Sequence, residues 1–184
     1  LYPDTPAPAS TASGFTKYFD YTGSLAVSGT VGAVATEGVT QSFAYDLSGV
    51  DTACDSGAGT AANSCGIHIH SGTTCTADAG GHYFTGAVTT DPWTAIGYTE
   101  SGGTASGMVS VTTGGTAADI AGRAVVVHGF DGGRIACALL VPDGCDITSS
   151  SFSDPGRFCV GACNAALQTA ETECASEGDQ ATAD

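Results

Sequence analysis

Residues 122–141 read GRAVVVHGFDGGRIACALLV and hold two apolar runs on either side of a Gly-rich, acidic turn. Short apolar runs bounded by turn residues predict β-strands. Because side chains alternate along a strand, Val125 and Val127 are expected to face inward, and Val126 and His128 outward. This stretch therefore predicts two consecutive strands of a sheet.

Strand signals continue through the rest of the chain, between turns rich in Gly, Ser and Thr. In the run from Gly38 to Leu47, the side chains of Val39, Phe43, Tyr45 and Leu47 fall on one face. The further strands that we expect are Leu25–Val34, Gly66–His70, Trp93–Tyr98 and Ala105–Val111. Twenty-seven glycines and few good helix formers also favour strands and turns over helices. We predict an all-β fold, a Greek-key β-barrel or sandwich of about eight antiparallel strands.

The two ends of the chain differ from this pattern. Residues 1–23 begin with three prolines in eight positions and continue with Ser and Thr, which predicts an extended N-terminal arm outside the core. Residues 142–184 form a Cys-rich C-terminal tail, in which the Ala-rich stretch 162–173 predicts a helix. The barrel is expected to occupy residues 24–141.

The charge balance excludes two classes of protein. Nineteen acidic and four basic residues give a net charge of −15, whereas phosphate backbones are bound through Lys and Arg that displace counterions. The longest wholly apolar run, Ile135 to Val141, has seven residues, and a membrane span needs about 20. We therefore expect no nucleic-acid partner and no membrane span.

Eight cysteines and a first residue that is Leu1 rather than Met indicate the compartment. An even and dense set of cysteines is typical of disulfide frameworks made in an oxidising environment. We expect a mature secreted protein, extracellular or at the cell surface, whose signal peptide has been removed.

Four histidines carry the chemistry that the sequence suggests. His68 and His70 stand two apart on a predicted strand, so their rings share one face about 6.5–7 Å apart. His82 follows a Gly-rich loop, and His128 ends an apolar run. All four are expected on the outside of the barrel wall. Four imidazoles without nearby thiolates suit copper, whose divalent state prefers tetragonal nitrogen coordination.

Two stretches, GIHIHSGTTCTADAGGHYF at 66–84 and GRAVVVHGFDGGRIACALL at 122–140, resemble the copper/zinc superoxide dismutases. The resemblance implies four copper ligands and a disulfide between Cys75 and Cys137. It also implies that Arg134 holds superoxide beside the metal. The residues that it assigns to copper are His68, His70, His82 and His128.

Two departures from that family place the resemblance with its copper-only branch. No histidine lies between His82 and His128 to bind zinc, and only six positions separate His128 from Arg134, so the family's long electrostatic loop is missing. The resemblance then implies one copper per chain, no zinc, and an antioxidant enzyme that converts superoxide to dioxygen and hydrogen peroxide. Arg134 and His82 would be its catalytic residues.

The sequence leaves open which groups pair with His82 and with Arg134. Without zinc, the second ring nitrogen of His82 needs an acceptor, and Asp91 or Asp78 could serve. Arg134 could instead form an ordinary strand-end ion pair with Asp131.

The remaining cysteines suggest further disulfides. Cys54 and Cys65 close a short Gly-rich loop before the predicted strand that carries His68, so we expect them to pair by proximity. The tail cysteines have three alternative connectivities. They are Cys145, Cys159, Cys163 and Cys174.

Two other functions fit the same residues. The barrel could be a structural subunit of an extracellular or cell-surface assembly that self-associates or binds partners through the arm and the tail. It could also bind copper without turnover.

Overall fold

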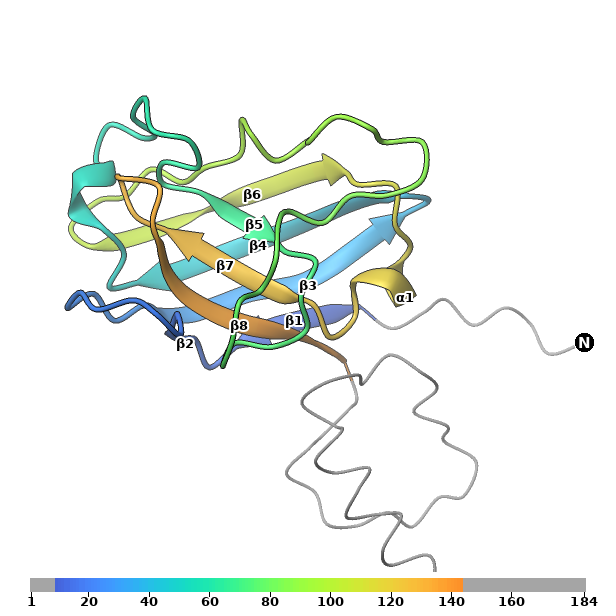
Figure 1. Ribbon diagram of the computed structural model, residues 1–184, viewed down its shortest axis with the longest axis horizontal. Helices are drawn as coiled ribbons and strands as arrows, with labels where there is room; N and C mark the ends of the chain where they lie inside the picture. The colour runs from blue at the N-terminus through green and yellow to red at the C-terminus, as the bar shows by residue number, and fades with distance from the viewer. Residues whose placement is uncertain (1–8, 144–184) are drawn as a thin grey trace, which may run out of the picture.

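The computed structural model describes residues 9–143 of the chain (Figure 1). They form a sheet of eight strands with two short helical turns. The strands are β1 (Ser10–Ser13), β2 (Thr16–Lys17), β3 (Ser28–Glu37), β4 (Thr40–Ser48), β5 (Ile67–Ile69), β6 (Thr104–Thr112), β7 (Ala124–His128) and β8 (Arg134–Pro142). The helical turns are η1 (Thr52–Cys54) and α1 (Ala117–Ile120).

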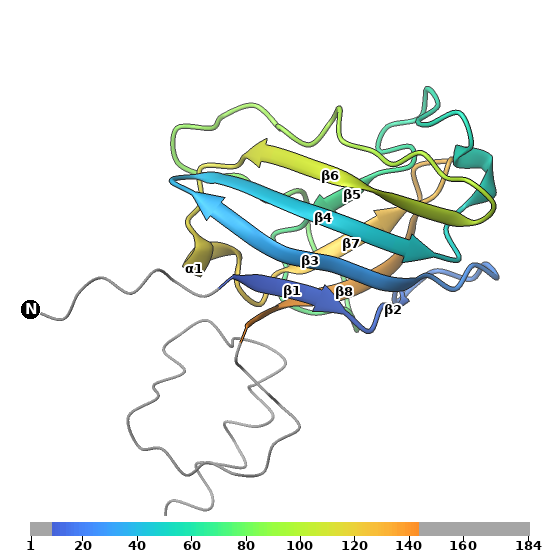
Figure 2. The same ribbon diagram turned by 180° about the vertical axis from the view of Figure 1, so that it is seen from behind.

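All strand pairs are antiparallel, and the sheet curls into a half-barrel. The hydrogen-bonded order is β5-β7-β8-β1-β3-β4-β6, and β2 adds to β8. Seen from opposite sides, β5, β7 and β8 lie on one wall and β3, β4 and β6 on the other (Figures 1 and 2). The all-β prediction with about eight antiparallel strands is confirmed.

The core lies between these walls and follows the predicted alternation. Val125 and Val127 from β7 pack there with Ile67 and Ile69 from β5, and all four are fully buried. From β4, Phe43, Tyr45 and Leu47 join the same core, as predicted for one strand face.

One residue of the predicted β4 face lies elsewhere. Val39 sits in the two-residue turn between β3 and β4 and is 42% exposed. Gln41 takes an inward position instead, because its amide donates a hydrogen bond of 2.7 Å to the carbonyl of Gly115. A buried polar side chain is tolerated when it is paired in this way.

The prediction that the N-terminal arm contributes nothing to the core is wrong for its described part. Strand β1 inserts between β3 and β8, and β2 pairs with β8. Ala12 is fully buried and Tyr18 is 2% exposed. The strand signal is weak in sequence because β1 reads STAS, whose small side chains carry no hydrophobic alternation. Pairing with both neighbours supplies the order that propensity does not.

The predicted strand Trp93–Tyr98 is also wrong. Residues 70–103 run between β5 and β6 without a regular strand, and the pairing there is limited to isolated bridges such as Gly66 with Gly97. Trp93 sits in a turn after Pro92, yet it is fully buried and its indole donates to the carbonyl of Tyr83 at 2.8 Å. The apolar residues of this segment pack into the core although the backbone is irregular. Their sequence pattern therefore resembles that of a strand.

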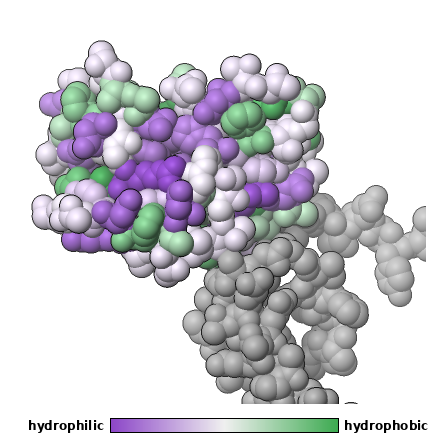
Figure 3. All heavy atoms as spheres, viewed as in Figure 1, coloured by the Kyte–Doolittle hydropathy of each residue, from purple (hydrophilic) through white to green (hydrophobic). Residues whose placement is uncertain are grey.

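No helix within residues 9–143 is long and apolar enough to cross a bilayer. Large exposed apolar side chains such as Phe19, Met108 and Phe130 are dispersed, and hydrophobic residues are scattered among hydrophilic ones on the face drawn in Figure 3. The predicted tail helix and the four tail cysteines lie outside the described residues.

Candidate metal centre

Four histidines from three parts of the chain converge on one point. His68 comes from the middle of β5, His70 follows that strand, His128 ends β7, and His82 comes from the long segment after β5. One nitrogen from each ring can be chosen so that all four atoms lie within 4.8 Å of one another. The set predicted from the sequence is therefore brought together in full.

The position of His82 depends on how the chain returns after β5. His82 forms an antiparallel bridge with His70. Backbone bonds from Tyr83 to Ile69 and from Ser71 to Gly81, each 2.8 Å, flank that bridge. Figure 1 shows this segment, coloured green, crossing the outer face of β7 and β8. The third histidine of the sequence thus lies beside the first two.

Three of the rings are oriented by backbone carbonyls. His68 Nε2 lies 2.7 Å from the oxygen of Ile96, and the Nδ1 atoms of His70 and His128 each lie 2.9 Å from the oxygens of Gly80 and Gly132. A carbonyl only accepts, so each of these nitrogens carries the proton of a neutral ring. The opposite nitrogen of each ring keeps its lone pair.

The fourth ring, that of His82, is oriented by a carboxylate. Its Nδ1 lies 2.7 Å from Asp91 Oδ2, and the other oxygen of Asp91 accepts the backbone N–H of Trp93 at 2.9 Å. Of the two carboxylates weighed from the sequence, Asp91 is the partner. His82 Nε2 is thereby left free to act as a ligand.

The free lone pairs are the feature that points to a metal. His68 Nδ1 is buried and has no hydrogen-bond partner among the described residues. The Nε2 atoms of His70 and His128 lie 3.4 Å apart, although both neutral rings direct a lone pair there. A buried unpaired acceptor is costly, and a cation between the rings would satisfy all of them at once. The four residues therefore fit a metal ion bound by nitrogen.

The sequence did not predict how deeply the histidines are buried. The rings do lie on the outer side of the sheet, but His68, His70 and His128 are at most 1% exposed because the long segment covers them. Burial, followed by the charges of neighbouring groups, lowers the pKa of His68 to about 2, of His70 to about 3 and of His128 to about 4. These rings are neutral at neutral pH, as metal ligands must be.

Arg134 lies beside the centre and pairs with Asp78 rather than with Asp131. Its guanidinium bonds Asp78 Oδ1 and the oxygen of Gly80, each at 2.6 Å, and also the hydroxyl of Tyr18. Asp131 instead accepts the backbone N–H of Gly133. Arg134 is close enough that its charge helps to lower the pKa of His70 and His128.

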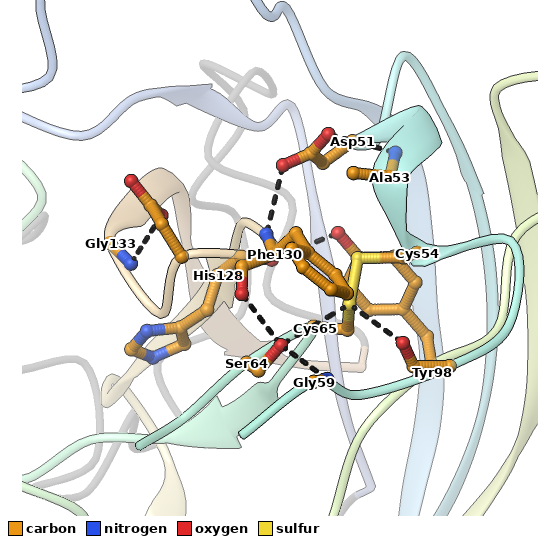
Figure 4. Close-up of a disulfide and its surroundings, with 12 residues drawn as sticks. Asp51, Ala53, Cys54, Gly59, Ser64, Cys65, Tyr98, His128, Phe130 and Gly133 are labelled. Atoms are coloured by element: carbon orange, nitrogen blue, oxygen red, sulfur yellow. Dashed lines mark hydrogen bonds between the residues drawn. A yellow bond between two sulfur atoms is a disulfide. The ribbon is translucent and has the colours of Figure 1, made fainter. Parts of the chain in front are cut away.

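Both predicted disulfides are confirmed. Cys54 bonds Cys65 and Cys75 bonds Cys137, with Cα–Cα distances of 5.9 and 5.6 Å. The second joins the segment that carries Gly80 to β8. The first lies next to the loop that follows His128 (Figure 4).

The surroundings of the first disulfide hold the His128 loop in place. The hydroxyl of Tyr98 donates to the carbonyl of His128 at 2.8 Å, and Asp51 accepts the backbone N–H of Phe130 at 2.8 Å (Figure 4). Ser64 donates to the carbonyl of Phe130 at 2.7 Å. These bonds fix the turn that presents the Gly132 oxygen to His128.

Sequence reasoning missed several residues that support the centre. The acceptors of Ile96, Gly80 and Gly132 are backbone oxygens, which every residue possesses, so no side-chain pattern reveals them. Gly132 gives a partial signal: its φ is +81°, and a Cβ there would lie 2.0 Å from the oxygen of Ala62. Tyr18 lies in a segment that the sequence placed outside the core.

No protein-family model matches this chain, and no curated protein matches it. The resemblance to the copper/zinc superoxide dismutases therefore depends on the sequence motifs alone.

Proposed function

We propose that this chain is a secreted superoxide dismutase of the copper-only type, with one copper and no zinc. One observation carries the proposal. Four imidazoles bring one nitrogen each to a common point, and Arg134 lies beside it. Nitrogen ligands suit copper, and the two disulfides fit an oxidising compartment.

The bound copper would supply the one-electron redox chemistry that dismutation requires. The protein's part is to hold four nitrogens in fixed orientations. His68 would bind through Nδ1, and His70, His82 and His128 would bind through Nε2, because their other nitrogens are held by acceptors. Fixed ring orientation limits the rearrangement between oxidation states.

Arg134 would attract and orient the anionic substrate. Three of its five N–H groups donate to Tyr18, Asp78 and Gly80 within the described residues, so two are left for an anion. With a net charge of −15, attraction over long distances is opposed. A local cation is therefore the element that favours superoxide.

His82 is the ring best suited to handle a proton. Its Nδ1–H is held by Asp91, and 7% of its side chain is accessible, unlike the fully enclosed His68. When Nε2 of His82 is not bound to the metal, it would hold a proton for delivery to the reduced substrate.

The test is to load the purified protein with copper, remove free metal, and measure copper stoichiometry and dismutation by pulse radiolysis. We expect one copper per chain and a rate near the diffusion limit. Arg134→Ala should keep the copper and lower the rate by at least about tenfold, because an anion-orienting donor is lost. No bound copper would contradict the assignment of the site.

A second function is favoured by one feature of the centre. Arg134 is already paired with Asp78, which reduces its pull on anions. A protein that binds copper without turnover would need no free guanidinium. One copper per chain, negligible dismutation in the wild type and unchanged copper affinity in Arg134→Ala would support that function instead.

A further inference from the structure

The hydroxyl of Tyr18 is the centre of a hydrogen-bond network beside the metal centre. It accepts from Arg134 Nη1 and from the backbone N–H of Ala79 at 2.9 Å, and it donates to Asp78 Oδ1 at 3.2 Å. A phenol has one donor and two acceptor positions, and all are used. The side chain is 2% exposed.

This network connects a substrate-facing cation with a metal ligand. The Gly80 oxygen accepts from Arg134 Nη2 at 2.6 Å and from His70 Nδ1 at 2.9 Å. Asp78 holds the same turn by accepting the backbone N–H of Gly80 at 2.9 Å. Displacement of the 78–80 turn would therefore disturb Arg134 and His70 together.

The backbone fixes Tyr18 relative to Arg134. Lys17 pairs with Ala136 in the β2–β8 register, and the N–H of Tyr18 donates to the oxygen of Ile135 at 3.1 Å. The guanidinium carbon of Arg134, the first residue of β8, lies 5.3 Å from the centroid of the Tyr18 ring. The N-terminal segment thus supplies part of the wall of the site.

We infer that Tyr18 is a positioning residue that sets the affinity of the metal centre for anions, by holding Arg134 and the 78–80 turn in place. The role of Arg134 in this inference rests on the proposed function. The alternative is that Tyr18 contributes only packing, since its ring lies in a buried cluster with Ala79, Val126 and Cys137. The two accounts differ in what the hydroxyl does.

Tyr18→Phe removes the hydroxyl and keeps the ring. Tyr21→Phe is the matched control, because the hydroxyl of Tyr21 accepts only from the backbone N–H of Leu25 among the described residues. In the metal-free protein, we expect hydrogen exchange at the Arg134 Nη1–H to accelerate about fivefold in Tyr18→Phe, because the hydrogen bond from Nη1 to the hydroxyl is lost. The control should match the wild type.

In the copper-loaded protein, azide serves as the anion probe. Its dissociation constant should rise about fivefold in Tyr18→Phe, with copper stoichiometry unchanged. The same substitution in the Arg134→Ala background should add nothing, because the effect passes through Arg134. Additive effects, or an unchanged azide affinity together with unchanged exchange, would overturn the inference.

The measurements separate this inference from the proposed enzyme. If the copper-loaded wild type binds azide but does not dismutate superoxide, the enzyme proposal is wrong. The role of Tyr18 is then still tested by the azide dissociation constants of Tyr18→Phe, Arg134→Ala and the double variant. If no copper binds, the role of Tyr18 is tested by hydrogen exchange at the Arg134 guanidinium in the metal-free protein. If Tyr18→Phe does not fold, Arg134→Ala must accelerate exchange of the Tyr18 hydroxyl proton in the metal-free protein. Unchanged exchange there would refute the network.

Discussion

At the scale of single residues, the centre is built from acceptors that decide which nitrogen of each ring stays free. Three of these acceptors are main-chain oxygens and cannot be removed by a side-chain substitution. Asp91 is the exception, because its carboxylate alone fixes the ring of His82. It is therefore the residue at which ligand orientation can be tested directly.

Asp91→Ala should lower the affinity for copper about 10- to 100-fold, the usual loss when the partner of a ligating histidine is removed. The physical reason is that His82 can then rotate or change its tautomer. Competition with a chelator of known affinity measures the change. Asp91→Asn keeps an acceptor oxygen and should lose less. Equal losses in both variants would show that the carboxylate charge, rather than orientation, is what matters.

At the scale of elements, two disulfides fasten the loops that carry the acceptors. Cys75–Cys137 spans 62 positions and joins the segment of Gly80 to β8, whereas Cys54–Cys65 spans 11. Of the four cysteines, Cys137 lies in β8, whereas Cys54, Cys65 and Cys75 lie outside the strands. The loops therefore depend on covalent closure more than the strands do.

Replacing both members of a pair by Ala should destabilise the protein, and the loss should be larger for the longer closed loop. The chain-entropy relation gives about 4 kcal/mol for Cys75 with Cys137 and about 3 kcal/mol for Cys54 with Cys65. Urea unfolding of the metal-free variants measures the loss. A larger loss for the shorter loop would mean that contacts around Cys65, such as those of Ser64 with Phe130, dominate over loop closure.

At the scale of the whole molecule, the enclosed imidazoles make the metal-free fold sensitive to acid. The pKa values of His68, His70 and His128 lie near 2, 3 and 4 in the folded state, against about 6.5 in the unfolded chain. The unfolded chain thus takes up protons first as the pH falls. Stability is complete above pH 6.5 and is lost below it.

The free energy of unfolding of the metal-free protein should decrease by up to about 4 kcal/mol per pH unit below pH 6.5, because three groups each contribute about 1.4. Urea unfolding at pH 7.5, 6 and 5 measures this slope. His128→Asn provides the control and should reduce the slope by about one third. A stability that stays constant between pH 7.5 and 5 would contradict the folded-state values.

The pairing of Cys75 with Cys137 was implied only by the resemblance to a known family. The sequence by itself determined the fold class, the candidate set of four histidines and the pairing of Cys54 with Cys65 within the described residues. These follow from local signals, namely the alternation in β4 and β7, the spacing of His68 and His70, and the short loop between Cys54 and Cys65. Alternation fixes which face a side chain occupies, because it depends only on the strand that carries it.

Tertiary structure alone decided what surrounds those residues. It covered the histidines with the segment 70–103, and it paired Arg134 with Asp78 rather than Asp131. It also brought Tyr18, which follows β2, to Arg134 beside the metal centre. The physical reason is that burial, ion pairing and main-chain acceptors depend on contacts between distant positions. STAS in β1 and the carbonyl of Gly80 carry no local signal, so their roles appear only once the chain has folded.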